Sequence, residues 1–120
     1  MITIYGSFPG LNEFIDANRT GRGKWQKGND MKQRDQKAIM LQLPRIRLSG
    51  PIFIKCIFYC KDRRKDPDNI SGYFHKILLD AMVERGMIPD DGWKHVKGFR
   101  DDFKIDRRMP RVEVEIEEIS

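Results

Sequence analysis

A nine-residue apolar run followed by a long amphipathic segment most constrains how this chain can fold. Residues 52–60 read IFIKCIFYC, a β-branched and aromatic composition that favours a central strand. In residues 67–85 the apolar side chains recur at helical spacing and fall within about 60° of Phe74 around the helix axis. They are Ile70, Ile77, Leu78 and Ala81. Gly86 then suits the end of the helix.

Weaker patterns predict the remaining elements. Strands are expected over residues 1–7, 94–105 and 111–119, and helices over residues 10–18 and 30–43. Residues 19–29 are glycine-rich and basic, which favours an exposed loop. A chain of 120 residues has room for one hydrophobic core. The sequence therefore predicts a single α+β domain over residues 1–120, with a mixed β-sheet packed against two main helices.

The charge balance is basic. There are 23 Lys and Arg against 18 Asp and Glu, a net charge of +5. This suits a polyanionic partner, although many basic proteins bind no nucleic acid.

The N-terminus lacks a signal peptide pattern and no apolar run approaches a membrane span, so we expect a cytoplasmic protein without membrane contact. A protomer this small also favours a homodimer, which would bury more surface.

The two cysteines lie in the predicted central strand. Cys56 and Cys60 are four strand positions apart, or about 13 Å, which is too far for a disulfide. No other Cys or His is near them in the sequence, so a zinc site is not expected and both are predicted to be buried thiols.

A pair of aspartates marks the junction between the strand and the main helix. Asp66 and Asp68 flank Pro67 and directly follow the basic residues Arg63, Arg64 and Lys65. One interpretation is structural, because Asp66 would cap the helix and Asp68 would lie in its first turn, where the helix dipole favours an anion. The other is that the two carboxylates bind a metal ion.

A second acidic pair supports the metal hypothesis. Asp90 and Asp91 follow the same helix, where adjacent carboxylates repel each other unless they share a cation. Mg²⁺ prefers hard oxygen ligands, and a phosphodiester nuclease uses such an ion. Mn²⁺ is a possible substitute. Since a 19-residue helix is about 28 Å long, the second loop must fold back or the two pairs must meet across a dimer.

With both pairs in view, the chain resembles the RusA family of Holliday-junction resolvases over most of its length. The resemblance rests on chain length, the basic strand end, and an ordered set of residues. The set is Asp66, Asp68, Asn69, Lys76, Asp80, Ala81, Met82, Gly86, Asp90 and Asp91. It implies a RusA-like fold and a homodimeric, Mg²⁺-dependent enzyme that makes paired nicks in four-way DNA junctions during recombination and repair. It also implies a bacterial host cell, with a prophage as one source of the gene. Asp66, Asp68 and Asp91 match the family's metal-binding acids, with Asp90 beside them.

The catalytic lysine of the family marks a departure. The family has a lysine one turn after its D-x-D-N motif, where this chain has Gly72. Lys76 lies one turn further on the same helix face, so it is the candidate for that role, and a solvated surface lysine is the alternative. His75 is expected to be a surface residue.

Two basic segments are candidates for DNA contact. Arg63, Arg64 and Lys65 adjoin the first acidic pair. In the predicted loop, cations surround an indole that could stack on an unpaired base, with a solvated loop as the alternative. These residues are Arg19, Arg22, Lys24, Trp25 and Lys27. Arg107, Arg108 and Arg111 are expected to serve solubility.

Two other functions compete with junction resolution: a non-catalytic nucleic-acid-binding module, and a nuclease for other branched DNA in phage replication or packaging.

Overall fold

The computed structural model describes residues 1–19 and 24–119, and for residues 24–26 it describes only the backbone. The elements in chain order are β1 (Ile2–Tyr5), α1 (Leu11–Arg19), α2 (Lys24–Met40), β2 (Ile52–Cys60), α3 (Pro67–Arg85), β3 (Val96–Ile105) and β4 (Arg111–Glu118). They form a four-stranded mixed sheet with three helices, which confirms the predicted α+β class.

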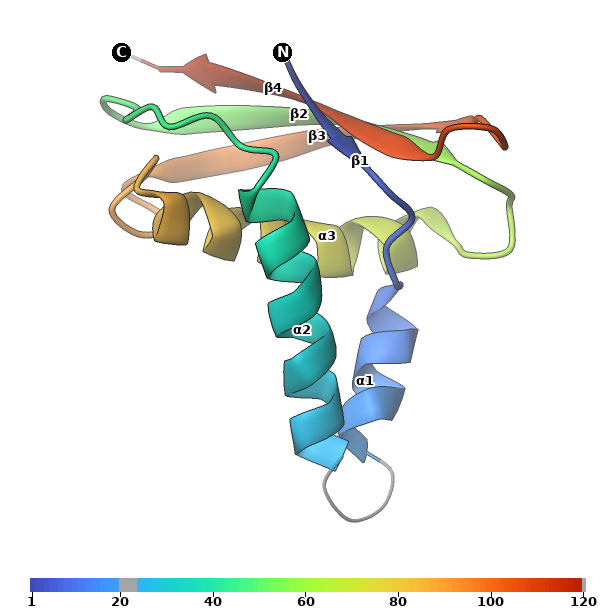
Figure 1. Cartoon of the computed structure of the whole chain (residues 1–120). Coiled ribbons are helices and arrows are strands. Elements are labelled where there is room, and N and C mark those ends of the chain that lie inside the picture. The colour runs from blue at the N-terminus through green and yellow to red at the C-terminus, as the bar shows by residue number, and fades with distance from the viewer. Residues whose placement is uncertain (20–23, 120) are drawn as a thin grey trace.

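The sheet has the order β1-β4-β2-β3. β4 pairs antiparallel with both β1 and β2, whereas β2 and β3 are parallel. A parallel pair needs a crossover connection, and α3 provides it by packing along one face of the sheet (Figure 1). No helix covers the opposite face of the sheet in this view. The single helix between parallel strands therefore determines which side of the sheet becomes the core.

The core lies between β2 and α3. Alternate residues of β2 are buried on the helix side: Ile52, Ile54, Cys56 and Phe58. The buried stripe of α3 comprises Tyr73, Phe74, Ile77, Leu78, Ala81 and Met82. This confirms most of the predicted stripe, while Ile70 packs at its margin. The helix ends at Gly86 with a φ of 82°, a left-handed conformation that glycine adopts without strain.

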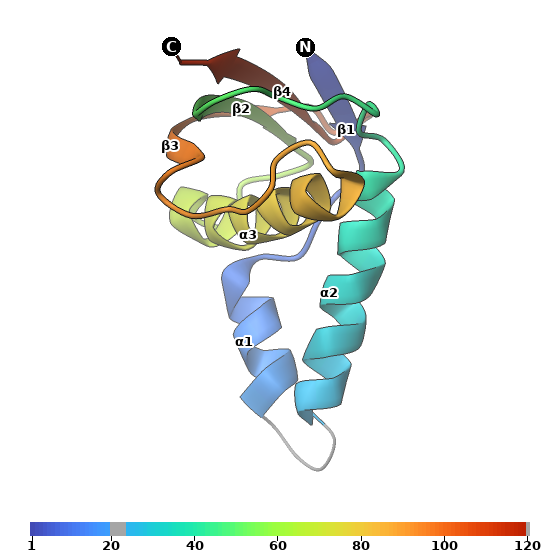
Figure 2. The ribbon, with the colours of Figure 1, turned by 90° about the vertical axis from the view of Figure 1, so that its left-hand side faces the viewer.

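The helices α1 and α2 form a hairpin that projects away from the sheet (Figures 1 and 2). The predicted loop over residues 19–29 is wrong in part, because α2 already begins at Lys24. Gly28 is buried, and a Cβ built there would meet the side chain of Asn18 in α1. The glycine that suggested a loop therefore permits close helix packing. Arg22 lies outside the described residues.

Several element boundaries also differ from prediction. β1 ends at Tyr5 because Gly6 adopts a positive φ of 131°. α2 ends at Met40, and Leu43 lies in the turn that follows, with its N–H bonded to the Met40 carbonyl. β3 starts at Val96, since the preceding residues form a turn. Within the described part of the chain, no helix is long and apolar enough to span a membrane.

Candidate functional site

The first acidic pair lies at the start of α3. Asp66 occupies the N-cap position with extended backbone (φ −70°, ψ 151°), yet its side chain makes no capping hydrogen bond. Pro67 follows in the first turn, where its missing N–H costs no hydrogen bond. The side chains of Asp66 and Asp68 are both exposed. The structure therefore does not support a capping role for the Asp66 carboxylate, whose oxygens stay available to a ligand.

Basic side chains surround this end of α3. Arg63 and Lys65 line a surface pocket together with Asp66, and Lys104 of β3 adds a cation that the sequence did not reveal. Arg63 is exposed. Arg64 is also highly exposed, with its Nε 3.7 Å from Oδ2 of Asp62. The structure thus brings Lys104 of β3 to the pocket that the acidic and basic residues between β2 and α3 line.

Lys65 has a further contact. Its Nζ lies 2.7 Å from Oε1 of Glu13 in α1. Burial acts to raise the pKa of Glu13, but the hydrogen bonds from Lys65 and from the Gly10 N–H outweigh it, so this pKa lies below its ordinary value. Lys65 therefore links α1 to the basic segment, and Glu13 partly compensates its charge.

The second acidic pair lies beyond the other end of α3. Asp90 accepts a 2.9 Å hydrogen bond from the Gly92 N–H, and its Oδ2 is 3.5 Å from Nε2 of His95. Asp90 therefore stabilises its own turn, a role that the sequence interpretation missed. Asp91 is exposed and lines an open pocket with Asp80 and Glu84 of α3.

The two acidic pairs do not meet within one protomer. They flank a helix of 19 residues, which spans about 28 Å. The loop that carries Asp91 folds back only to the C-terminal part of α3, where it meets Asp80 and Glu84. Asp80 is itself about 18 Å along the helix axis from Asp68. One ion cannot bridge that span, so a site containing both pairs requires two protomers.

The two lysine positions of α3 differ in surroundings. Lys76 is exposed and lies about 12 Å along the helix from Asp68. A Cβ built at Gly72 would lie 3.3 Å from Cδ2 of Leu11. Because α1 packs on the helix at this point, a lysine at position 72 would meet α1 rather than open solvent. Lys76 is the accessible cation on this helix face.

Asn69, the last residue of the D-x-D-N motif, has a structural contact. Its Oδ1 accepts a 2.7 Å hydrogen bond from the backbone N–H of Asn12, near the start of α1. A Cβ at Gly10 would also collide with the Asn69 side chain. The motif therefore serves two purposes, since its aspartates are exposed while its asparagine attaches α1 to α3.

Of the predicted DNA contacts in the N-terminal basic segment, the structure describes the side chains of Arg19 and Lys27. Both are exposed; Arg19 is the last residue of α1, and Lys27 lies in the first turn of α2. The end of α1 and the start of α2 lie at the end of the hairpin distant from the sheet (Figure 2). The backbone of Lys24 and Trp25 is helical. Neither Arg19 nor Lys27 lines the pockets that contain Asp66 and Asp91.

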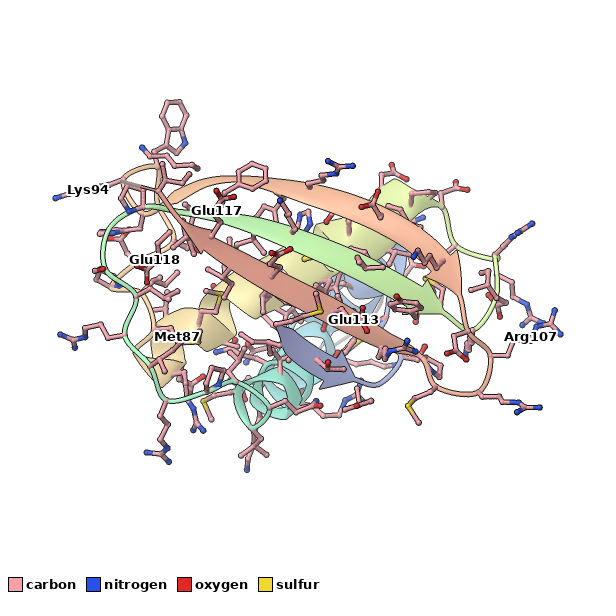
Figure 3. The ribbon with its side chains drawn as sticks, turned by 90° about the horizontal axis from the view of Figure 1, so that it is seen from above. Met87, Lys94, Arg107, Glu113, Glu117 and Glu118 are labelled. Atoms are coloured by element: carbon pink, nitrogen blue, oxygen red, sulfur yellow. The ribbon has the colours of Figure 1, made fainter. Side chains whose placement is uncertain are left out.

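An exposed tryptophan beside Asp91 was missed by the sequence interpretation. The exposed fraction of Trp93 is 93%, the highest among the large hydrophobic residues identified as exposed. Lys97 donates a 3.0 Å hydrogen bond to the Trp93 carbonyl, and Lys94 points outward from the same turn (Figure 3). The sequence signal was present in Asp-Gly-Trp-Lys, directly after the acidic pair. An indole that buries little surface in its own domain is a candidate for ligand contact.

Three arginines near the turn between β3 and β4 differ in role. Arg107 points outward at the opposite end of the molecule from Lys94 (Figure 3) and lines a small pocket with Asp62 and Arg63. Arg108 is exposed. Arg111, by contrast, pairs with Asp106 at 2.9 Å and lies over the Tyr59 ring. The prediction that all three serve solubility is therefore wrong for Arg111, which is held by its own domain.

A third group of titratable side chains lies between α3 and the edge strand β3. Nε2 of His75 is 2.9 Å from Oδ1 of Asp101, and its ring stacks on Phe99 with centroids 3.8 Å apart. The prediction that His75 is a surface residue is therefore wrong. The ligand atoms of Cys56, His75 and Asp101 lie within 4.8 Å of one another. The expectation that no metal-ligating partner is near the cysteines is therefore wrong for Cys56. Both cysteines are free, as predicted, with Cys56 buried and Cys60 partly buried.

Comparison of the sequence with models of known protein families gives no match, and comparison with curated proteins gives no match. The function is therefore argued from the arrangement of these side chains.

Proposed function

We propose that this protein is a Mg²⁺-dependent, structure-selective endonuclease that makes paired nicks in four-way DNA junctions. The observation that carries the proposal is the uncapped, exposed Asp66 carboxylate, which lines a pocket with Arg63, Lys65 and Lys104. The exposed Asp68 follows two residues later in the first turn of α3. Carboxylates that cap no helix and pair with no cation are suited to hard metal ions. When bound, Mg²⁺ would activate a water nucleophile and neutralise charge on the phosphate. Mn²⁺ has similar ligand preferences and is expected to substitute.

The residues of the chain divide the remaining work. Asp66 and Asp68 would hold the ion, and Asp91 of a second protomer would complete the site, with Asp90 orienting that loop. Arg63 and Arg64 would bind the DNA backbone, because exposed guanidinium groups form bidentate contacts with phosphate oxygens. Lys76 is exposed on α3 and would reach a phosphate held along that helix.

Trp93 supplies a reason for branch selectivity. Its indole is exposed near Asp91, and exposed aromatic rings stack on base faces. Base stacking is interrupted at the branch point of a junction and not in continuous duplex DNA. Two-fold symmetry suits this substrate, because a homodimer presents identical sites to two strands of a four-way junction. Recognition would therefore depend on DNA shape and backbone, with base contacts limited to the branch point.

Co-expression of two inactive variants tests the proposal directly. Asp68→Asn and Asp91→Asn are each expected to bind a synthetic junction without nicking it. In a mixed dimer, one composite site would carry both substitutions and the other would carry none. Random pairing gives half mixed dimers with half their sites intact, so about a quarter of wild-type nicking should return.

The controls make each outcome decisive. Asp30→Asn neutralises an exposed carboxylate elsewhere, on α2, and should nick at the wild-type rate. No recovery in the co-expressed pair would reject the shared site. Full activity of Asp68→Asn alone would reject the assignment of the metal ligands.

The second candidate is a non-catalytic nucleic-acid-binding module. The separation of the acidic pairs along α3 favours it, because Asp66, Asp68 and Asp91 do not meet within one protomer. In that case the wild type would bind junctions and never nick them, at any Mg²⁺ or Mn²⁺ concentration. A nuclease for other branched DNA would instead cut three-way or flapped substrates faster than four-way junctions.

A further inference from the structure

Three different metal-ligating side chains meet beneath the edge strand β3. One ligand atom each from Cys56, His75 and Asp101 can be chosen so that all lie within 4.8 Å of one another. Cys56 and Asp101 are direct register partners in the parallel pair β2/β3, and His75 approaches from α3. Three elements that are distant in sequence thus contribute one donor each.

The geometry of the group is close to that of a metal centre. Ligand atoms around a tetrahedral zinc ion lie about 3.3–3.7 Å apart, given bonds of about 2.0–2.3 Å. The His75–Asp101 distance of 2.9 Å would open slightly. The Cys56 sulfur, within 4.8 Å of both partners, would close by about 1.5 Å at most. Stacking on Phe99 holds the imidazole in place. Small side-chain rotations therefore suffice.

Burial and access also fit. Cys56 has no exposed surface, whereas His75 and Asp101 keep 22% and 18% of their side chains exposed. An ion can therefore enter past the imidazole and the carboxylate at the sheet edge. A reactive catalytic cysteine is a poor alternative, because a nucleophile must be accessible to its substrate and this sulfur is not.

We propose that Cys56, His75 and Asp101 bind a transition-metal ion, with Zn²⁺ as the expected occupant and water as a fourth ligand. A thiolate and an imidazole select Zn²⁺ over Mg²⁺, which prefers oxygen ligands alone. The site is separate from the Asp66 pocket and does not depend on the nuclease proposal. On binding, the sulfur–metal bond forms as the thiol proton of Cys56 passes to the buffer.

Cobalt titration of the intact protein tests the site. Co²⁺ bound to a thiolate gives a sulfur-to-metal charge-transfer band, which purified apoprotein should develop to one equivalent and lose when Zn²⁺ is added. Cys56→Ser should remove the band. The matched control is Cys60→Ser, which changes the other free cysteine of the same strand and should leave the band unchanged. Mg²⁺ in excess should not displace the cobalt.

His75→Gln and Asp101→Asn give a second measurement that does not require Cys56→Ser to fold. Loss of even an outer-shell partner of a metal site typically costs about 10–100-fold in affinity, so removal of a direct ligand should weaken Co²⁺ binding by at least about 100-fold. Absence of the band in the wild type, or its persistence in Cys56→Ser, would overturn the proposal. Unchanged cobalt affinity in both other variants would do the same.

Discussion

The hydroxyl of Tyr73 donates a 2.7 Å hydrogen bond to Oδ2 of Asp35, joining α3 to α2 inside the protein. Asp35 is the single buried charged residue of the described core. Burial and this carboxylate together raise the pKa of Tyr73 far above its ordinary value, so the phenol remains a donor at neutral pH. The helical hairpin is therefore anchored to α3 by a buried polar contact as well as by apolar packing.

Removal of this donor should destabilise the fold. Tyr73→Phe keeps the ring but leaves the buried carboxylate of Asp35 with Arg34 alone, whose Nε is 3.3 Å away. An unsatisfied buried acceptor costs about 1–3 kcal/mol. Urea unfolding should show that loss, while Tyr5→Phe, at an exposed residue, should change the unfolding free energy by less than about 0.5 kcal/mol. Equal stability of the two variants would contradict the anchoring role.

Asn69 should act through α1 rather than through catalysis. Asn69→Ala removes the acceptor for the Asn12 N–H and should cost about 0.5–2 kcal/mol, the usual range for a lost helix cap. Asn69→Asp retains that oxygen and should unfold close to the wild type. Amide exchange at Asn12 measures the contact directly, and slow exchange in Asn69→Ala would show that the assigned hydrogen bond is not needed.

The stability of the metal-free protein should fall at alkaline pH because of Cys56. Burial, with a smaller contribution from Asp101, raises the pKa of this thiol from 9.0 to about 12. Since the folded state disfavours the thiolate, its contribution is complete below about pH 9 and declines as pH rises toward about 12. The slope for one group is about 1.4 kcal/mol per pH unit.

Cys56→Ser isolates that contribution. Its unfolding free energy, measured by urea in the presence of a chelator, should decline less steeply than that of the wild type above about pH 9. Parallel curves for the two proteins would show that the sulfur titrates equally in the folded and unfolded states.

The salt dependence of junction binding should identify the phosphate contacts. Each cation that neutralises a phosphate contributes about 0.9 to the slope of log affinity against log salt concentration. Arg63→Gln should reduce the magnitude of that slope by about 0.9. Arg45→Gln, at an exposed residue in the segment between α2 and β2, should leave it unchanged. Binding titrations at several salt concentrations measure the slope for each variant. A slope for Arg63→Gln equal to that of the wild type would show that Arg63 contacts no phosphate.

Trp93 should report binding by its fluorescence. The chain has two tryptophans, so Trp25→Phe leaves Trp93 as the sole indole emitter. Stacking on a base should quench that emission when a four-way junction is added, and Trp93→Ala should weaken junction binding by about 1–3 kcal/mol. A duplex of the same length should quench far less. Equal quenching by junction and duplex would contradict a role at the branch point.

The sequence by itself determined the elements whose residues carry strong local patterns. The apolar run of β2, the stripe of α3 and the left-handed Gly86 were all predictable, because each depends on neighbours within one strand or helix. The closeness of Asp66 and Asp68, which are two residues apart in the chain, was equally local. Where a pattern had two physical meanings, sequence was insufficient: Gly28 indicated a loop but permits the contact between α1 and α2.

Only the tertiary structure decided which side chains meet. Cys56, His75 and Asp101 come from two strands and a helix, so their proximity follows from the parallel register and the placement of α3. The separation of Asp68 from Asp91 likewise follows from the rigid length of that helix. Local patterns specify elements because backbone hydrogen bonds and side-chain periodicity are local. Sites assembled from several elements depend on packing between segments distant in the chain, which no local pattern encodes.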